Sequence, residues 1–384
     1  MWNRHNDIYV WMLACVLMLS ACSGDDVAEN GASDAETAVS FSATVPTFSL
    51  RSVVSSTSYL QTQTLGFGVF AYYTGSTPWA TAEATATPNF MYNQQVTYST
   101  DHWTYSPVKY WPNDNQPADG SGATGSQAHS YVSFFAYAPY SGAGLTSLSG
   151  NTATEAPTVG YTWVNNVDPD SQGDLLYATP QTNLTKPDVS SVVTFEFYHA
   201  LAAIEFKVRR KDATGAPIIL SGLTLNSSAA ATAATTALGT TITTATLNTS
   251  GTFNLGTSAW GSFGTSTPTI TYADTNIHGD LKGTHSADAT KTGVTEYTDE
   301  TAHALTAYTP NLLLLMPQEN TVTIPFTLSY TLGGTAKSPS SIITFTKPEG
   351  GWALAMGKKY TVVLIIDGGE VESYLLRAQE AEQW

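Results

Sequence analysis

His278, Asp280 and His285 carry the imidazole and carboxylate groups that bind zinc, and they lie within eight residues of one another. The segment that contains them, HGDLKGTH, is polar. We therefore favour a polar loop with chance histidines over a metal site at this position.

Asp168, Asp170 and Asp174 are spaced like the oxygen ligands of a calcium-binding loop. Gln172 stands at the fifth position of that loop, and Thr179 stands at the twelfth, where a bidentate glutamate belongs. The sequence therefore does not favour calcium here, and we expect neither a metal nor another cofactor.

Nucleophile and phosphate-binding motifs are absent from the sequence. It contains no G-x-S-x-G, H-E-x-x-H or C-x-x-C motif and no glycine loop followed by the lysine that binds phosphate. His199 lies in the apolar run FEFYHALAAIEF, which predicts a hydrogen-bonded core histidine. We therefore expect that the protein is not an enzyme.

Aromatic residues crowd into the segment from residue 92 to residue 111, among them Tyr92, Trp103, Tyr105, Tyr110 and Trp111. Aromatic faces of this kind can stack on sugar rings. They can equally form the core of a β-sandwich, where aromatic side chains supply much of the buried area. The alternation of Trp103 and Tyr105 favours the core.

The composition favours short strands and excludes one class of partner. Only 12% of the 384 residues are charged, which argues against solvated helices and coiled coils. The chain has 15 basic and 31 acidic residues, a formal net charge of −16. Such a field repels phosphate backbones, so we exclude nucleic acid as a partner.

Alternating apolar residues predict an all-β fold made of sandwiches or barrels. Phe67 and Val69 alternate with Phe70, and the segment 204–209 alternates between apolar and charged residues. No segment of twelve or more residues has a convincing helical period. The Ala/Thr-rich segment 229–250 is compatible with disorder, but its alternation favours an exposed edge strand.

A cluster of charged residues from Lys207 to Asp212 is the best candidate for a domain boundary. It separates two blocks of strands that are each close to the usual size of a domain. We therefore predict an N-terminal sandwich at residues 52–210 and a C-terminal sandwich at residues 211–384.

The amino terminus predicts export and lipid attachment. Residues 10–21 are an apolar run with the length of a signal-peptide core, which predicts a signal peptide over residues 1–21. The run ends in Leu-Ser-Ala-Cys22, which resembles the lipobox of bacterial lipoproteins, where the cysteine receives lipid. The alternative is a plain signal peptide with an accidental cysteine. Residues 23–40 are polar and acidic, as in a flexible tether.

Val39, Phe41 and Ala43 alternate and predict a first strand. Arg51 follows it and is the only basic residue between Arg4 and Lys109. It is either a solvated loop arginine or a processing site.

The chain resembles the fimbrillin-like surface lipoproteins of Bacteroidota. The resemblance rests on ordered motifs that run from the lipobox to the final residue: 91–112, 132–140, 174–178, 195–208, 357–367 and Trp384. It implies two transthyretin-like β-sandwich domains and a subunit of a surface pilus, exported to the outer membrane.

The resemblance also implies how such subunits assemble. In the family, a trypsin-like protease cuts after an arginine in the first strand region, and Arg51 matches that residue in position and type. The cut removes a lipidated leader, here residues 22–51, and opens an apolar groove. A strand from another subunit then fills this groove. The strand removed would lie around Val39 to Phe48.

The tail of the chain leaves two alternatives. Val371, Tyr374 and Leu376 are candidates for a last strand of the C-terminal domain, with nothing spare to donate, and this favours a tip or accessory subunit. Alternatively, the tail is itself the donor strand. The partners that we expect are other pilus subunits, membrane lipid through Cys22, and an unknown host or bacterial surface ligand.

A different hypothesis is a permanently lipid-anchored surface module that binds glycan or protein and does not polymerise. Exposed tryptophans such as Trp103 and Trp111 would carry the glycan binding.

Overall fold

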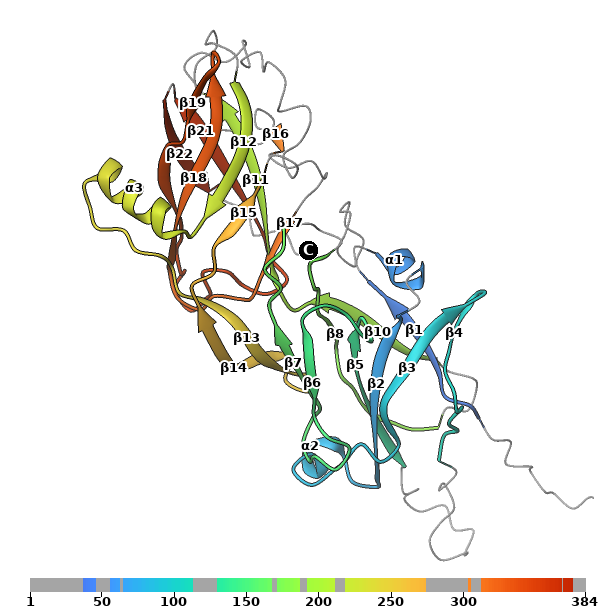
Figure 1. Ribbon diagram of the computed structural model, residues 1–384. Helices are drawn as coiled ribbons and strands as arrows, with labels where there is room; N and C mark the ends of the chain where they lie inside the picture. The colour runs from blue at the N-terminus through green and yellow to red at the C-terminus, as the bar shows by residue number, and fades with distance from the viewer. Residues whose placement is uncertain are drawn as a thin grey trace, which may run out of the picture. The chain divides into compact units, whose positions relative to one another are not determined.

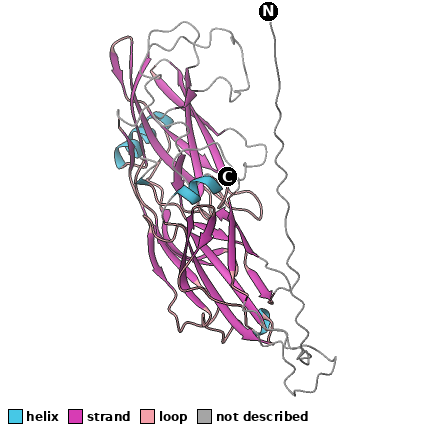
Figure 2. Ribbon diagram, turned by 90° about the vertical axis from the view of Figure 1, so that its right-hand side faces the viewer, coloured by secondary structure: helices cyan, strands magenta, loops and turns pink. Residues whose placement is uncertain are grey.

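Strands account for most of the secondary structure in the computed structural model, as the alternating apolar pattern predicts (Figures 1 and 2). The structure describes residues 37–45, 56–62, 65–112, 130–167, 171–186, 192–210, 218–273, 303–304, 312–367 and 369–375. These residues confirm the all-β fold class.

The largest sheet has eight strands in the order β1-β10-β8-β5-β2-β3-β4, and β9 also pairs with β5. Its strands are β1 (Ser40–Thr44), β2 (Phe67–Gly75), β3 (Met91–Ser99), β4 (His102–Thr104), β5 (Tyr131–Ala138), β8 (Leu176–Ala178), β9 (Gln181–Leu184) and β10 (Val192–His199).

Three further sheets contain the other strands described. One contains β11 (Ala202–Arg210), β16 (His303–Ala304), β17 (Leu312–Leu315), β21 (Lys359–Asp367) and β22 (Glu370–Leu375). Another contains β12 (Ile218–Leu225), β15 (Ile270–Tyr272), β18 (Val322–Leu332), β19 (Thr335–Lys337) and β20 (Ser340–Phe345). The last contains β6 (Leu145–Leu148), β7 (Thr158–Thr162), β13 (Leu247–Asn254) and β14 (Ala259–Ser266).

The eight-stranded sheet buries side chains on both of its faces. Successive residues of a strand point to opposite faces, and on β2 Phe67 and Val69 belong to one apolar cluster whereas Phe70 and Tyr72 belong to another. The first cluster includes β1 and lies on the face where Phe67 points. This face carries the candidate site described below.

The strand pairing crosses the boundary that we predict after residue 210. β11 pairs in parallel with β21, so the change from the first sheet to the next comes between β10 and β11 rather than after β11. In addition, β7 pairs with β13, which lies beyond that boundary in the sequence. All described residues lie within one unit of the chain, Glu36–Trp384. The division into two sandwiches at residue 210 stays a prediction.

The sequence expectation of an edge strand over the Ala/Thr-rich segment 229–250 is wrong for its first half, and its end at Leu247 begins β13, an inner strand between β14 and β7. Residues 228–238 form the helix α3 (Ser228–Leu238), because alanine is the residue with the highest helix propensity. The Ser227 hydroxyl accepts a hydrogen bond from the Ala230 N–H, and Gly239 ends the helix at a φ of 68°. α3 contacts β18 and β20 (Figure 1). The other two helices are short, α1 (Thr57–Thr62) and α2 (Trp79–Ala82).

Asn226 is a buried polar residue, 1% exposed, that ties three loops together after β12. Its amide donates to the carbonyls of Ala245 and Pro268 and accepts from the Ala245 N–H. Its φ of 59° lies in the left-handed region. We expect Asn226→Ala to lower the free energy of unfolding by about 2–4 kcal/mol, because it orphans these groups. Asn226→Gly, which suits the same φ, should be about 1 kcal/mol less damaging. Urea unfolding measures the free energy of unfolding of both variants. Equal losses in the two variants would mean that the positive φ of residue 226 does not add to the cost of alanine.

Candidate functional site: strand β1 and the groove that it fills

Strand β1 stands at the end of the eight-stranded sheet and pairs in parallel with β10. The register runs from Ser40 opposite Val192 to Thr44 opposite Glu196. Just before β1, the backbone makes antiparallel hydrogen bonds to another segment, with Val39 N donating to Lys109 O at 2.9 Å and Trp111 N to Thr37 O at 2.9 Å. β1 is therefore held by β10 along its length and by residues 109–111 at its start.

One face of β1 is buried, as the alternation in the sequence predicts. The side chains of Val39, Phe41, Ala43 and Val45 are 2%, 5%, 3% and 3% exposed. Ser40 and Ser42, between them, are half-buried, and Thr44 is exposed. An apolar face on an edge strand needs a groove to receive it, and here the strand fills that groove.

Phe41 is surrounded by four aromatic rings. It stacks on Phe195 with ring centroids 5.8 Å apart and planes at 18°. The rings of Phe67 and Phe134 meet it edge-on at 6.4 and 6.0 Å, and Tyr105 lies 5.3 Å away. Aromatic pairs contribute about 0.5–1.5 kcal/mol each beyond the area that they bury. Phe41 is therefore the main anchor of β1, and without it the groove would expose an aromatic surface.

The hydroxyl of Tyr105 fastens the start of β1. It donates to Val39 O at 2.8 Å, lies 3.4 Å from Lys109 O, and accepts from Lys109 N at 3.2 Å. Burial is the main cause that raises the pKa of Tyr105 above its ordinary value. Sequence reasoning places Tyr105 in the core but misses this role, because no local pattern links residues 66 positions apart.

Replacing Tyr105 with Phe should weaken the attachment of β1, with a loss of about 1–2 kcal/mol in the free energy of unfolding. The loss should shrink at high pH. The pKa of Tyr105 is raised in the folded state, so above about pH 10 the unfolded chain loses this proton first. The stability due to Tyr105 is thus fully present below pH 10 and falls above it. Urea unfolding at pH 7 and pH 10.5 measures both effects, and a difference that grows with pH would contradict them.

The end of β1 is fastened by helix α1. Val45 N donates to the Thr57 hydroxyl at 2.9 Å, and that hydroxyl lies 3.3 Å from Val45 O. Arg51 belongs to the segment that joins β1 to α1, and residues 46–55 lie outside the described residues. A cut after Arg51 would remove the covalent link between β1 and α1. β1 would then be held only by non-covalent contacts, among them those with β10, residues 109–111, Tyr105 and Thr57.

The other predicted site residues lie partly within the described chain. Val371 is in β22 and is 5% exposed, and Tyr374 stands opposite Val363 in the antiparallel pairing of β22 with β21. Cys22 and Leu376 lie outside the described residues. β22 is therefore a strand of the chain's own sheet.

The two tryptophans of the aromatic cluster belong to the core and do not form a sugar-binding platform. Trp103 and Trp111 are 8% and 3% exposed and belong to the same apolar cluster as Phe41. Tyr92 and Tyr110 are exposed, at 41% and 45%. The alternative hypothesis, that Trp103 and Trp111 present an open surface to glycan, is therefore wrong, because both side chains are packed in the apolar core on one face of the sheet.

Of the two candidate metal clusters, the structure describes only Asp174. Asp174 is buried, and its Oδ2 lies 3.0 Å from Nδ1 of His199, which confirms the hydrogen-bonded core histidine. Asp168, Asp170 and the segment 278–285 lie outside the described residues. Elsewhere among the described residues, no group of three His, Cys, Asp or Glu side chains could hold a metal ion.

No helix in the described ranges is both long enough and apolar enough to cross a membrane.

Known fimbrial proteins are similar to this chain in sequence and in fold. Fimbrium subunit Fim1C of Phocaeicola vulgatus is 31% identical over 178 residues, which cover 42% of this chain and 42% of that protein. The chain thus spans less than half of the curated relative that it matches. A crystal structure of a fimbrial protein from Bacteroides vulgatus shares the fold, with a TM-score of 0.62 at 22% identity, over 88% of this chain and 98% of that one. The model of the fimbrillin-like family matches residues 53–377, and the chain belongs to that family.

Proposed function

We propose that the protein is a structural subunit of a cell-surface fimbrium that serves adhesion and is assembled by protease-triggered donor-strand exchange. The observation that carries the proposal is β1, a strand that fills an apolar groove at the end of a sheet. The family membership and the Fim1C relative support the role in a fimbrium.

Loss of β1 would create a surface that another strand can satisfy. The edge of β10 would present unpaired N–H and C=O groups, and the aromatic groove would lie open beside it. An added strand restores both the backbone hydrogen bonds and the apolar contacts. Contacts of this kind that do not close into a ring produce a fibre.

Before processing, we propose that lipid on Cys22 anchors the chain in the outer membrane, with residues 23–40 as the tether. The cut after Arg51 would then remove the anchor together with β1. A single cut would thus both release the chain from the membrane and open the groove.

We propose a tip or accessory position in the fimbrium. The pairing of β22 with β21 and the burial of Val371 support it, because a strand retained in its own sheet is not donated. The burial of Trp103 and Trp111 removes the observation that favoured a glycan-binding module that does not polymerise.

Mild trypsin treatment of the full chain tests the proposal. We expect a new amino terminus at Ser52 and, when other subunits of the fimbrium are present to donate a strand, oligomers that resist SDS, because the opened groove accepts that strand. Amino-terminal sequencing and gel electrophoresis measure the two results. A chain cut after Arg51 that stays monomeric, even when mixed with other subunits of the fimbrium, would favour the non-polymerising module instead.

A further inference from the structure

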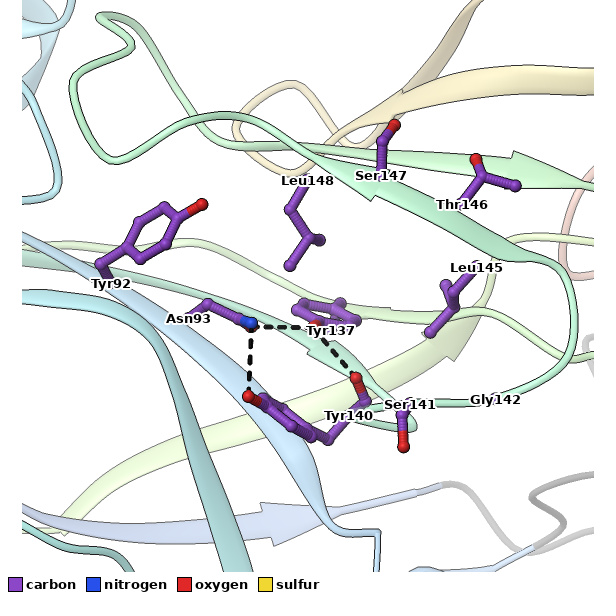
Figure 3. A pocket seen from close by; sticks show the side chains of 10 residues that line it. All are labelled: Tyr92, Asn93, Tyr137, Tyr140, Ser141, Gly142, Leu145, Thr146, Ser147 and Leu148. Carbon is purple, nitrogen blue, oxygen red and sulfur yellow. Dashed lines mark hydrogen bonds between the residues drawn. The ribbon is translucent and has the colours of Figure 1, made fainter.

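A pocket of about 430 Å³ lies between β3, the end of β5 and β6, away from the groove of β1 (Figure 3). β3 contributes Tyr92 and Asn93, and β5 contributes Tyr137. The remaining lining residues are Tyr140, Ser141, Gly142, Leu145, Thr146, Ser147 and Leu148. A volume of this size falls within the range of small-molecule sites.

The inner wall of the pocket is a hydrogen-bonded group of three side chains. The hydroxyl of Tyr137 donates to Asn93 Oδ1 at 2.8 Å and lies 3.1 Å from Tyr140 O, and Asn93 Nδ2 lies 3.5 Å from the Tyr140 hydroxyl (Figure 3). The ring of Tyr137 lies against Gly68, where a Cβ would come within 2.4 Å of it. The absence of a side chain at Gly68 thus lets the ring take this place.

Asn93 has a φ of 44° and lies between Met91 and Gln94, where the pairing of β3 with β2 shifts register. A β-bulge of this kind can re-aim a side chain, and asparagine tolerates positive φ better than most residues. An amide nitrogen carries two hydrogens. Among the described residues, Asn93 Nδ2 has one partner, the Tyr140 hydroxyl, so one N–H is available to a ligand.

The lining combines aromatic and aliphatic surface with neutral polar groups. Tyr92 is 41% exposed, and Leu145 and Leu148 point toward Tyr137, whereas Thr146 and Ser147 point away from it (Figure 3). No lining residue is an Asp, Glu, Lys, Arg or His, so a charged ligand would find no ionic partner here. The geometry points to a binding site for a neutral saccharide of one or two rings. The C–H face of a sugar packs on an aromatic ring, and its hydroxyls pair with amides and hydroxyls.

The chain offers well-matched variants for the test. Asn93→Gly removes the amide but suits the φ of 44°, so the strand should keep its shape. Asn183→Gly is the control, because Asn183 also has a positive φ, 57°, and lies outside the pocket. It loses one side-chain hydrogen bond, from Trp79 N, whereas Asn93→Gly loses two. Tyr92→Ala removes the ring, whereas Tyr92→Phe removes only the hydroxyl that donates to Ser149 O.

The experiment measures binding of free sugars to the full chain by saturation-transfer NMR and titration. The probes are glucose, galactose, mannose, N-acetylglucosamine and lactose, with N-acetylneuraminic acid as a charged probe. We expect at least one neutral sugar to bind in the millimolar range. Asn93→Gly and Tyr92→Ala should weaken that binding by about tenfold or more, as expected for one lost contact. Asn183→Gly and Tyr92→Phe should leave it within about twofold.

Three results would overturn the proposal. They are no binding of any neutral sugar, binding of the acidic sugar alone, and neutral-sugar binding that survives both Asn93→Gly and Tyr92→Ala. Circular dichroism and the unfolding midpoint of each variant show whether it folds. Because the pocket does not involve β1 or Arg51, failure here leaves the proposed assembly unaffected.

Discussion

Arg51→Gln should stop assembly altogether: after mild trypsin treatment, with other subunits of the fimbrium present as strand donors, we expect the variant to remain monomeric where the wild type forms SDS-resistant oligomers. The physical reason is that the linker between β1 and α1 stays intact. An uncut β1 competes for its groove as part of the same chain, at an effective concentration far above that of any donor in solution. The measurement is gel electrophoresis without boiling, alongside mass spectrometry of the intact chain.

Arg51→Lys is the matched control for this experiment. Trypsin cleaves after lysine as well as arginine, so this variant should assemble with trypsin and fail with an arginine-specific protease. That pattern would separate the role of the cut from any role of the side chain. Oligomers of Arg51→Gln as abundant as those of the wild type would mean that the exchange does not require cleavage at this residue.

Phe41→Ala should have the largest effect on stability among substitutions in β1. Phe41 is 5% exposed and lies among Phe67, Tyr105, Phe134 and Phe195. Truncating a buried phenylalanine costs about 3–5 kcal/mol, because contacts are lost and a cavity remains. We expect a loss of that size in the free energy of unfolding of the uncut chain, measured in urea.

Ser42→Ala provides the control within the same strand, since Ser42 is on the other face of β1 and is half-buried. It should change the free energy by no more than about 0.5 kcal/mol. A synthetic peptide of residues 37–45 added to cut protein extends the test. The wild-type peptide should block assembly by refilling the groove, and the peptide with Phe41→Ala should not. Equal inhibition by the two peptides would show that Phe41 does not anchor the strand.

Much of the fold follows from alternation in the sequence. On β2, Phe67 and Val69 face one core and Phe70 faces the other, as predicted, because the period of a strand fixes which side chains share a face. Ile204 and Phe206 are buried on β11 for the same reason. The buried face of β1 could also be predicted, since Val39, Phe41 and Ala43 alternate with small polar residues.

Strand partners and the helix α3 could not be predicted in this way. Alternation gives the face of a strand but does not specify its neighbour, so the pairing of β7 with β13 has no local signal. The error at α3 arose because threonine favours strands, and its presence hid the helix propensity of alanine between Ser227 and Gly239. At the candidate site, the hydroxyls of Tyr105 and Thr57 were missed because both fasten β1 through contacts with distant parts of the sequence.

The parallel pairing of β1 with β10 has a consequence for the order of folding. Ser40 and Val192 are partners although the other six strands of the sheet lie between β1 and β10 in the chain. Closing a loop of that length costs about 4 kcal/mol in chain entropy, and contacts with such sequence separation form slowly. Although β1 comes first in the chain, we therefore expect it to dock only after β10 has joined β8 and completed the groove. We expect the other strands of the sheet to fold before β1 docks. A sheet that forms without β1 can also stay folded after β1 has been removed.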